Sequence, residues 1–231
     1  MRPFDLEHSS WAYRADFVLY GMLVAAMALT VLFFSPLSLA RVLWAWVAGG
    51  VFAWTFVEYL LHRFVLHGLA PFRDWHAEHH NRPVALIVAP TLLSLGLFVV
   101  LVALPAWWLI GSWSTCALML GLMTGYLGYG LTHHATHHTV IPSAVLSNWL
   151  AKRRRWHAVH HLFSKRSPFE AVHPKKGGPY GVSSGFWDHV FGTTNAAALA
   201  NNTAIHSCDP ESSESFAAQK NKDHRKRARH D

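Results

Sequence analysis

The sequence is poor in charged residues and in cysteine. Asp, Glu, Lys and Arg together make up 14% of the 231 residues, whereas a soluble domain carries about 25%. Between Pro83 and Ala151 none of these four residue types occurs. The two cysteines, Cys116 and Cys208, are too few for a disulfide framework. These shortages exclude an ordinary soluble domain and a small secreted protein held by disulfides.

Apolar residues are abundant and form long runs. They make up 52% of the chain, and four stretches come close to the roughly 20 apolar residues that a membrane-spanning helix needs. These stretches are residues 17–34, 42–61, 85–104 and 113–132. No small-residue cleavage site follows the first stretch, so we expect a span and not a signal peptide. Pro105 and the Gly111-Ser112 pair predict a turn between the last two spans.

The basic residues are distributed unevenly, and this predicts the orientation in the membrane. Fourteen of the 20 Lys and Arg follow residue 151, whereas the loops at 35–41 and 105–112 contain one, Arg41. By the positive-inside rule, the opposite side of the membrane, with both termini, faces the cytosol. We therefore expect an all-α, multi-pass integral membrane protein of the endoplasmic reticulum or a bacterial inner membrane. Two helical hairpins would carry a cytosolic helical cap, and no nucleic-acid-binding module is recognisable.

Histidines gather at the ends of the predicted spans. Twelve of the 18 fall in four groups: HRFVLH at 62–67, WHAEHH at 75–80, HHATHH at 133–138 and WHAVHH at 156–161. Spacings of three and four place side chains on one face of a helix. His62 and His67 are five apart and diverge by about 140° on a straight α-helix. They converge only if the helix ends or bends there, or each serves a different metal.

Metal ligation explains these groups better than a structural role. Neutral imidazoles on one helix face would each need a hydrogen-bond partner, and protonated ones would repel one another. A metal ion removes both difficulties because it binds the neutral ring. One ion takes four to six ligands, and even ten of these twelve imidazoles would exceed that number, which indicates two ions. Imidazole suits Zn, Fe and Cu alike, so the residues by themselves do not select the metal.

In their order around four spans, these motifs resemble the fatty acid hydroxylase superfamily of membrane di-iron enzymes. HRFVLH matches an HX4H box, WHAEHH and WHAVHH match HX2HH, and HHATH supplies HX3H. FVEYLLHRFVLH at 56–67 is similar to the first box of fatty acid 2-hydroxylases. YGVSSGFWDHVFGT at 180–193 is similar to their C-terminal signature. The resemblance covers about residues 40–195.

The resemblance implies ten metal ligands and no further catalytic residue. The ligands are His62, His67, His76, His79, His80, His133, His137, His157, His160 and His161. It implies two iron ions that activate O2, and zinc is able to replace them in purified protein because the affinity order favours it over Fe²⁺.

The third histidine box departs from the family pattern, which reads roughly G-Y-x-x-Y-D-x-x-H-Y-x-x-H-H. In this sequence Gly130 replaces the Asp and His134 replaces the Tyr. We align the box through Gly125-Tyr126 and Tyr129, which makes His133 and His137 the ligands. In that register His134 and His138 are candidates for hydrogen-bonding partners or surface residues.

Two carboxylates in apolar stretches, Glu58 and Asp188, are candidates for orienting the metal ligands. Glu58 precedes His62 by one helical turn, and a carboxylate at membrane depth needs a partner. It is suited to accept a ligating imidazole's N–H, and an ion pair with Arg63 or Arg14 is the alternative. Asp188 is suited to the same role or to capping a helix.

By resemblance, the reaction is 2-hydroxylation of a long acyl chain, in a free fatty acid or a ceramide, with a lipid taken from the bilayer. We expect the electrons to come from a separate protein, such as cytochrome b5 or a ferredoxin with its reductase. A sterol desaturase or methyl oxidase and a carotenoid hydroxylase are alternatives in the same superfamily. A metal transporter or a zinc-binding membrane protein is the rival from another class, although transporters place ligands near the membrane midplane.

The expected domain organisation is a membrane-embedded hydroxylase domain over residues 1–195 and a disordered basic tail over 196–231. The basic run Lys152-Arg153-Arg154-Arg155 precedes the last histidine box. We expect it to lie at anionic lipid headgroups, with docking of an electron donor as the alternative.

Overall fold

The computed structural model describes residues 7–138, 144–164, 178–194 and 199, and the predicted tail lies outside them apart from Leu199. Their regular structure is helical, as expected, with one isolated bridge between Glu7 and Ile87. The chain divides into two compact units. The first contains Met1–Trp75 and Ala85–Leu131, and the second contains His76–Val84 and Thr132–Asp231. Each unit is described by itself.

Three helical stretches are long and apolar enough to cross a membrane: Ser10–Phe34, Leu37–Leu66 and Thr91–His138. The first is α1 (Ser10–Phe34), whose amino end is capped by the Ser9 hydroxyl accepting from the Ala12 N–H. It ends before Pro36, because the residue that precedes a proline disfavours helix. The second contains a short 3₁₀ helix, η1 (Leu37–Leu39), α2 (Ala40–Leu60) and η2 (Leu61–Leu66), a π-helix.

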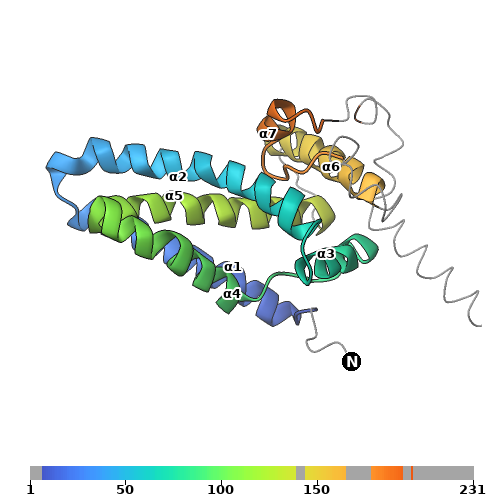
Figure 1. The fold of residues 1–231 in the computed structure, drawn as a ribbon, viewed down its shortest axis with the longest axis horizontal. Coiled ribbons are helices and arrows are strands. Elements are labelled where there is room, and N and C mark those ends of the chain that lie inside the picture. Colours follow the sequence, from blue (N-terminus) through green and yellow to red (C-terminus); the bar gives the residue numbers. More distant parts are fainter. Residues whose placement is uncertain (1–6, 139–143, 165–177, 195–198, 200–231) are drawn as a thin grey trace, which may run out of the picture. The chain divides into compact units, whose positions relative to one another are not determined.

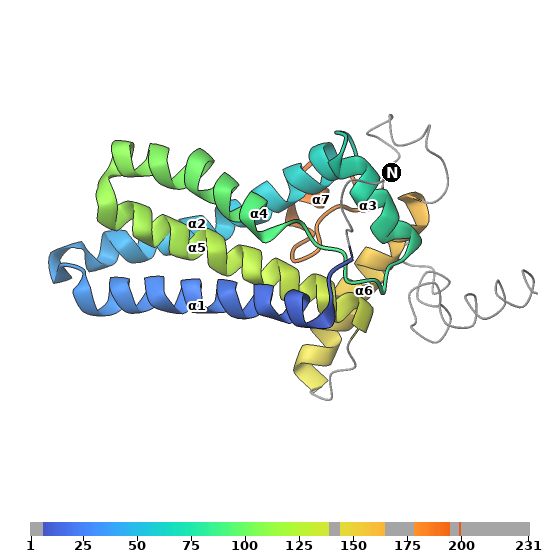
Figure 2. The same cartoon turned by 90° about the horizontal axis from the view of Figure 1, so that it is seen from below.

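The third stretch corrects the predicted limits of the last two spans. It consists of α4 (Thr91–Phe98), the π-helix η3 (Val99–Ala103) and α5 (Leu104–His138). Helix starts at Thr91, not at 85, because Leu86 and Ile87 pair with the segment before α1 and Pro90 precedes the helix. The only residue with a non-helical backbone inside the described α5 is Gly111, at φ 76° and ψ 169°. The chain reverses between α4 and the main part of α5 (Figure 2).

Pro105 lies inside this helix and does not form the turn that was predicted there. A proline in a helix removes one hydrogen bond and its ring clashes with the carbonyl group four residues earlier. The π-helix that ends at Ala103 directly precedes it, and such a wider turn moves that carbonyl away. Gly111 makes the turn because glycine adopts positive φ without a steric cost.

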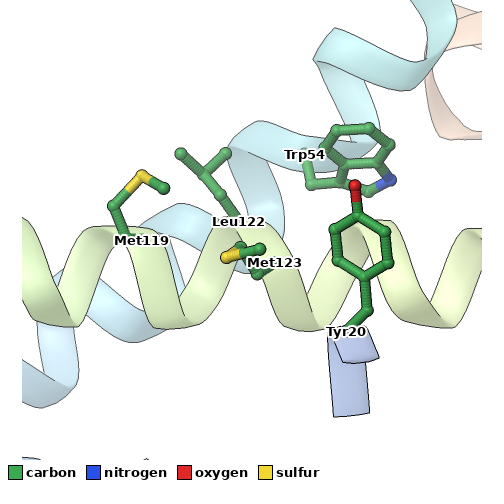
Figure 3. Packing of buried hydrophobic residues seen from close by; sticks show 5 residues of the cluster. All are labelled: Tyr20, Trp54, Met119, Leu122 and Met123. Carbon is green, nitrogen blue, oxygen red and sulfur yellow. The ribbon is translucent and has the colours of Figure 1, made fainter. Parts of the chain in front are cut away.

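The interior of the first unit is an aromatic and methionine-rich core (Figure 3). Tyr20 of α1 and Trp54 of α2 contact Met119, Leu122 and Met123 of α5. The Tyr20 hydroxyl also shares a hydrogen bond of 2.6 Å with Ser94 of α4. The helices of this unit run side by side (Figures 1 and 2). Large apolar side chains such as Leu37 and Trp108 point outward and are 92% and 86% exposed, which suits a lipid environment.

The second unit carries most of the histidines. It contains the end of α3 (Phe72–Asn81), the end of α5, α6 (Ala144–Ser164) and the short α7 (Phe186–Val190). Ala158 and Val159 of α6 are fully buried and form a small apolar core with Leu162 and Leu199. The segment 178–194, which includes α7, folds against α6 through Trp156.

Candidate metal centre

The two HX2HH groups lie on helices, as their spacing predicts. His76, His79 and His80 project from α3, and all three are buried. The corresponding three of α6 are His157, His160 and His161, each at most 3% exposed. Buried side chains of this polarity need partners, and within the second unit the partners are one another.

Five histidines form the first cluster of the second unit: His79, His133, His137, His157 and His161. His79, His133, His137 and His157 each offer a ring nitrogen, and these four atoms lie within 4.8 Å of one another. The Nε2 atom of His157 is central to the cluster. It lies 3.1 Å from that of His133, 2.9 Å from that of His137 and 3.0 Å from that of His161. The Nε2 atoms of His133 and His79 are also 3.1 Å apart.

Three histidines form the second cluster of the same unit. The Nε2 atom of His80 lies 2.9 Å from that of His76 and 3.1 Å from that of His160. The ring of His161 lies 4.2 Å from the ring of His80, so the two clusters adjoin. Each HX2HH group therefore contributes to both clusters.

His62 and His67 lie together in the first unit because the helix changes type between them. Leu61–Leu66 is a π-helix, in which hydrogen bonds link residues five apart and bring them to nearly the same side. The two rings are 5.3 Å apart and tilted by 30°. Burial lowers the pKa of His67 to about 4, which favours the neutral ring that metals bind. Of the alternatives that the spacing left open, the structure shows a change of helix type, and the two rings meet across a π-turn.

The clusters fit metal ions in donor type and spacing. Imidazole nitrogens bind first-row metals at about 2.0–2.1 Å, so two ligands at right angles are about 3.0 Å apart. The Nε2 separations in both clusters fall between 2.9 and 3.1 Å. Two neutral rings can share one N–H···N hydrogen bond. A single Nε2 atom that faces three other ring nitrogens cannot form a hydrogen bond with each of them, because it carries either one hydrogen or one lone pair.

His134 and His138 offer no ring nitrogen to either cluster, although the His138 ring lies 6.4 Å from that of His137. The rings of His134 and His138 stack on each other at 4.6 Å and 22°, and His138 is exposed. Among the described residues of the third box, His133 and His137 are those whose ring nitrogens belong to a cluster. The structure thus brings together the pair preferred from the family alignment.

The two predicted carboxylates have different surroundings. Glu58 is 3% exposed in α2, one turn before His62. Asp188 is fully buried, but its side chain accepts hydrogen bonds from Tyr180, Gly181, Thr193 and Trp156. Within the part of the chain that the structure describes, no imidazole donates to this carboxylate. Asp188 also lies inside α7 and therefore does not cap that helix. The prediction of a direct hydrogen bond to a ligand is therefore wrong for Asp188.

The basic run before the last box is partly internal, so only two of its four residues are exposed to lipid headgroups or a protein partner. Arg153 is buried, with its guanidinium 5.1 Å from the centre of the Trp156 ring. The Arg154 guanidinium donates to the Ala135 carbonyl through two nitrogens, at 3.0 and 3.2 Å. It thereby ties α6 to the end of α5. Lys152 and Arg155 remain exposed.

Sequence reasoning missed the role of Trp156. Its indole N–H donates to Asp188 at 3.2 Å, and its ring stacks on His189 at 5.5 Å. The tryptophan that precedes each HX2HH group was the available signal, but a lipid or packing role was equally consistent with it. Tyr180 was also missed, and its ring contacts that of His160 at 5.7 Å.

Acid is expected to destabilise the protein from about pH 6.5 downward. Burial, together with neighbouring imidazoles, lowers the pKa of His157 and His161 well below 6.5. Below pH 6.5 the unfolded chain therefore binds protons at these positions and the folded chain does not. The stability that these neutral histidines contribute is fully present above pH 6.5. Below that pH the free energy of unfolding falls by up to about 1.4 kcal/mol per pH unit for each group. Metal release acts in the same direction.

Thermal unfolding of the detergent-solubilised protein between pH 7.5 and 5 would measure this slope. The variant His161→Gln should show a flatter profile, and His138→Gln, at an exposed position, should match the wild type. A midpoint that stays constant over this pH range would contradict the expectation.

Comparison with known proteins gives consistent matches. A family model described as fatty acid hydroxylase matches residues 47–193, more than half of the chain. The ceramide very long chain fatty acid hydroxylase scs7 of Schizosaccharomyces pombe is 31% identical over 162 residues, 62% of this chain and 40% of that protein. The dihydroceramide fatty acyl 2-hydroxylase FAH1 of Arabidopsis thaliana is 32% identical over 161 residues, 64% and 59% respectively.

A solved structure shares the fold. It is that of full-length scs7p with only the hydroxylase domain visible, with a TM-score of 0.59 and 24% identity over 83% of this chain and 68% of that one. The human fatty acid 2-hydroxylase is 27% identical over 62% of this chain and 38% of that protein. This chain thus spans between 38% and 59% of the length of these curated relatives. The matches confirm the resemblance inferred from the motifs.

Proposed function

Because this chain belongs to the fatty acid hydroxylase family, we propose that it is a membrane monooxygenase that hydroxylates a long-chain acyl lipid. The position proposed is C2 of a fatty acid or of a ceramide acyl chain. The observation that supports it best is the set of eight histidines in the second unit, seven of them buried and His133 half-buried, whose ring nitrogens converge in two clusters. The names of the yeast and plant relatives, ceramide and dihydroceramide hydroxylases, support this substrate class.

The metal centre of the proposal uses ten histidines and two iron ions. The two clusters of the second unit supply eight ligands, and His62 and His67 supply the others by their match to the family's first box. When bound, the iron pair would activate O2 with two external electrons and oxidise an unactivated C–H bond.

The protein's own residues provide position and a dry environment. Burial keeps the His157 and His161 rings neutral, since it lowers their pKa well below 6.5, and neutral nitrogen is the form that binds metal. Burial also excludes bulk water, which protects a reactive centre from side reactions. We propose that Glu58 accepts a hydrogen bond from a ligating imidazole of its own helix and thereby fixes the ring's orientation.

We propose four membrane spans in two hairpins. Support for a division of the third apolar stretch comes from Gly111, where the backbone is not helical. The helix on each side of Gly111 is then at least as long as the roughly 20 residues of a span. An even number of spans puts all four histidine groups on one side, and the excess of Lys and Arg after residue 151 makes that side cytosolic.

The lipid and the electrons reach the site by different routes in this proposal. The acyl chain comes laterally from the bilayer, where its tail remains in hydrocarbon. A separate reduced protein on the cytosolic side, such as cytochrome b5 or a ferredoxin with its reductase, supplies the electrons. O2 is the co-substrate.

Lipid mass spectrometry tests the proposed function. The chain would be expressed in cells that lack their own acyl 2-hydroxylase, together with a competent electron donor, under ¹⁸O2. We expect acyl lipids that gain one labelled oxygen at C2. The variant His80→Ala should produce none, because His80 bridges two other ligands at 2.9 and 3.1 Å. His138→Ala is the matched control and should match the wild type.

The other outcomes discriminate between the alternatives. Loss of two hydrogens, or a change in sterols or carotenoids, would move the protein to another branch of the superfamily. No lipid change, with metal still bound, would contradict the hydroxylase assignment and favour a metal-binding membrane protein.

A further inference from the structure

The segment 178–194 is organised around one fully buried carboxylate. The Oδ1 atom of Asp188 accepts from the Tyr180 N–H at 2.7 Å and from the Thr193 hydroxyl at 2.6 Å. Its Oδ2 atom accepts from the Gly181 N–H at 2.8 Å and from the Trp156 indole at 3.2 Å. An ionised carboxylate offers about four acceptor sites, and all four are used here.

Only one of these four donors lies outside the segment, and it lies beside a cluster histidine. Trp156 belongs to α6 and directly precedes His157. It is held closely, since a Cβ atom on Gly185 would lie 2.6 Å from its ring. The same segment places the Tyr180 ring edge-on against His160, with ring centres 5.7 Å apart. Asp188 thus connects the segment to α6 at the position next to His157.

Consecutive residues of a helix point about 100° apart. Trp156 therefore faces Asp188 while His157 faces the first cluster, and fixing one direction fixes the other. If the indole were released, α6 could turn slightly about its axis. A displacement of a few tenths of an ångström would then reach the Nε2 atom of His157, which lies within 3.1 Å of three other ring nitrogens.

We propose that Asp188 is a positioning residue for the metal centre and acts through the indole N–H of Trp156. The inference rests on the proposed function, because it presupposes that the first cluster binds metal. Only a carboxylate suits this position. In an amide, the NH2 group would face at least one N–H that cannot accept, and that hydrogen bond would be lost.

Two conservative variants separate positioning from simple stabilisation. Of the four donors to Asp188, Trp156→Phe removes the one that comes from α6, and it keeps a smaller aromatic ring in the same place. Thr193→Val removes a donor to the same carboxylate that has no connection to α6, and keeps the side-chain shape. The whole chain in detergent would be stripped of metal and titrated with Co²⁺. Binding affinity, the visible absorption bands of Co²⁺ and the thermal unfolding midpoint would be recorded.

We expect Trp156→Phe to bind one of two Co²⁺ ions about tenfold more weakly. Loss of a group that orients a metal ligand lowers metal affinity by about 10- to 100-fold, and this estimate takes the lower end of that range. Its absorption bands should change, because they report ligand geometry. Thr193→Val should keep wild-type affinity and bands, even if its unfolding midpoint falls.

Equal changes in both conservative variants, or none in Trp156→Phe, would overturn the inference while leaving the proposed function intact. A wild-type chain that binds no Co²⁺ would overturn both.

Discussion

Replacing His133 by alanine is expected to remove one metal ion and to lower hydroxylation at least about 100-fold. The Nε2 atom of His133 lies 3.1 Å from those of His79 and His157, so its loss opens the first cluster. Residues that only orient a ligand cost 10- to 100-fold in metal affinity or activity, and a ligand itself should cost more. Iron per chain by elemental analysis, together with 2-hydroxylated acyl product, measures the effect.

The neighbouring histidine is the matched control. His134→Ala changes the same residue type one position along α5, but the His134 ring stacks on that of His138 outside the clusters. It should keep its iron and stay within about twofold of wild-type activity, since the half-buried His134 ring offers no nitrogen to the clusters. Loss of iron in His134→Ala with retention in His133→Ala would show that the third box uses the other register.

Replacing Gly50 by alanine is expected to destabilise the membrane unit. The added Cβ atom would lie 2.5 Å from the Leu118 carbonyl oxygen and 3.0 Å from the Gly121 Cα atom. These are backbone atoms that no rotamer change can move, so α2 and α5 must separate. Overpacking of this kind costs about 1–3 kcal/mol or more. For a chain of this size that lowers the unfolding midpoint by roughly 3–10 °C.

The adjacent glycine again provides the control. Gly49 lies in the same helix, and a Cβ atom there would have nothing within 4 Å. Gly49→Ala should leave the midpoint unchanged or raise it, because alanine favours helix over glycine by up to about 1 kcal/mol. Thermal unfolding followed by size-exclusion chromatography in detergent compares the two. Equal shifts would mean that the close approach of α2 and α5 does not limit stability.

Periodic patterns predicted much of the site because they are local. Helical spacing put His76, His79 and His80 on one face, and these residues are buried on one helix as expected. The resemblance to the family selected His133 and His137 over their neighbours. Spacing could not predict the π-turn that brings His62 and His67 together, because helix type depends on side-chain packing around it.

Spacing could not sort the ligands between the two clusters either. Relative to His76, His79 is turned about 60° to one side and His80 about 40° to the other. These directions differ enough for His79 to join the first cluster while His76 and His80 join the second. Which cluster receives which ring depends on the helices packed opposite, and one helix's sequence does not contain that information.

By itself, the sequence determined the all-helical membrane class, the main apolar spans and the histidines that share a helix face. Each follows from composition or from the geometry of a single helix. Only the tertiary structure decided the sorting of imidazoles into clusters, the helical place of Pro105 and the contacts of Asp188. The reason is that Asp188 meets Trp156 across 32 positions of chain, and such contacts depend on how separate elements pack.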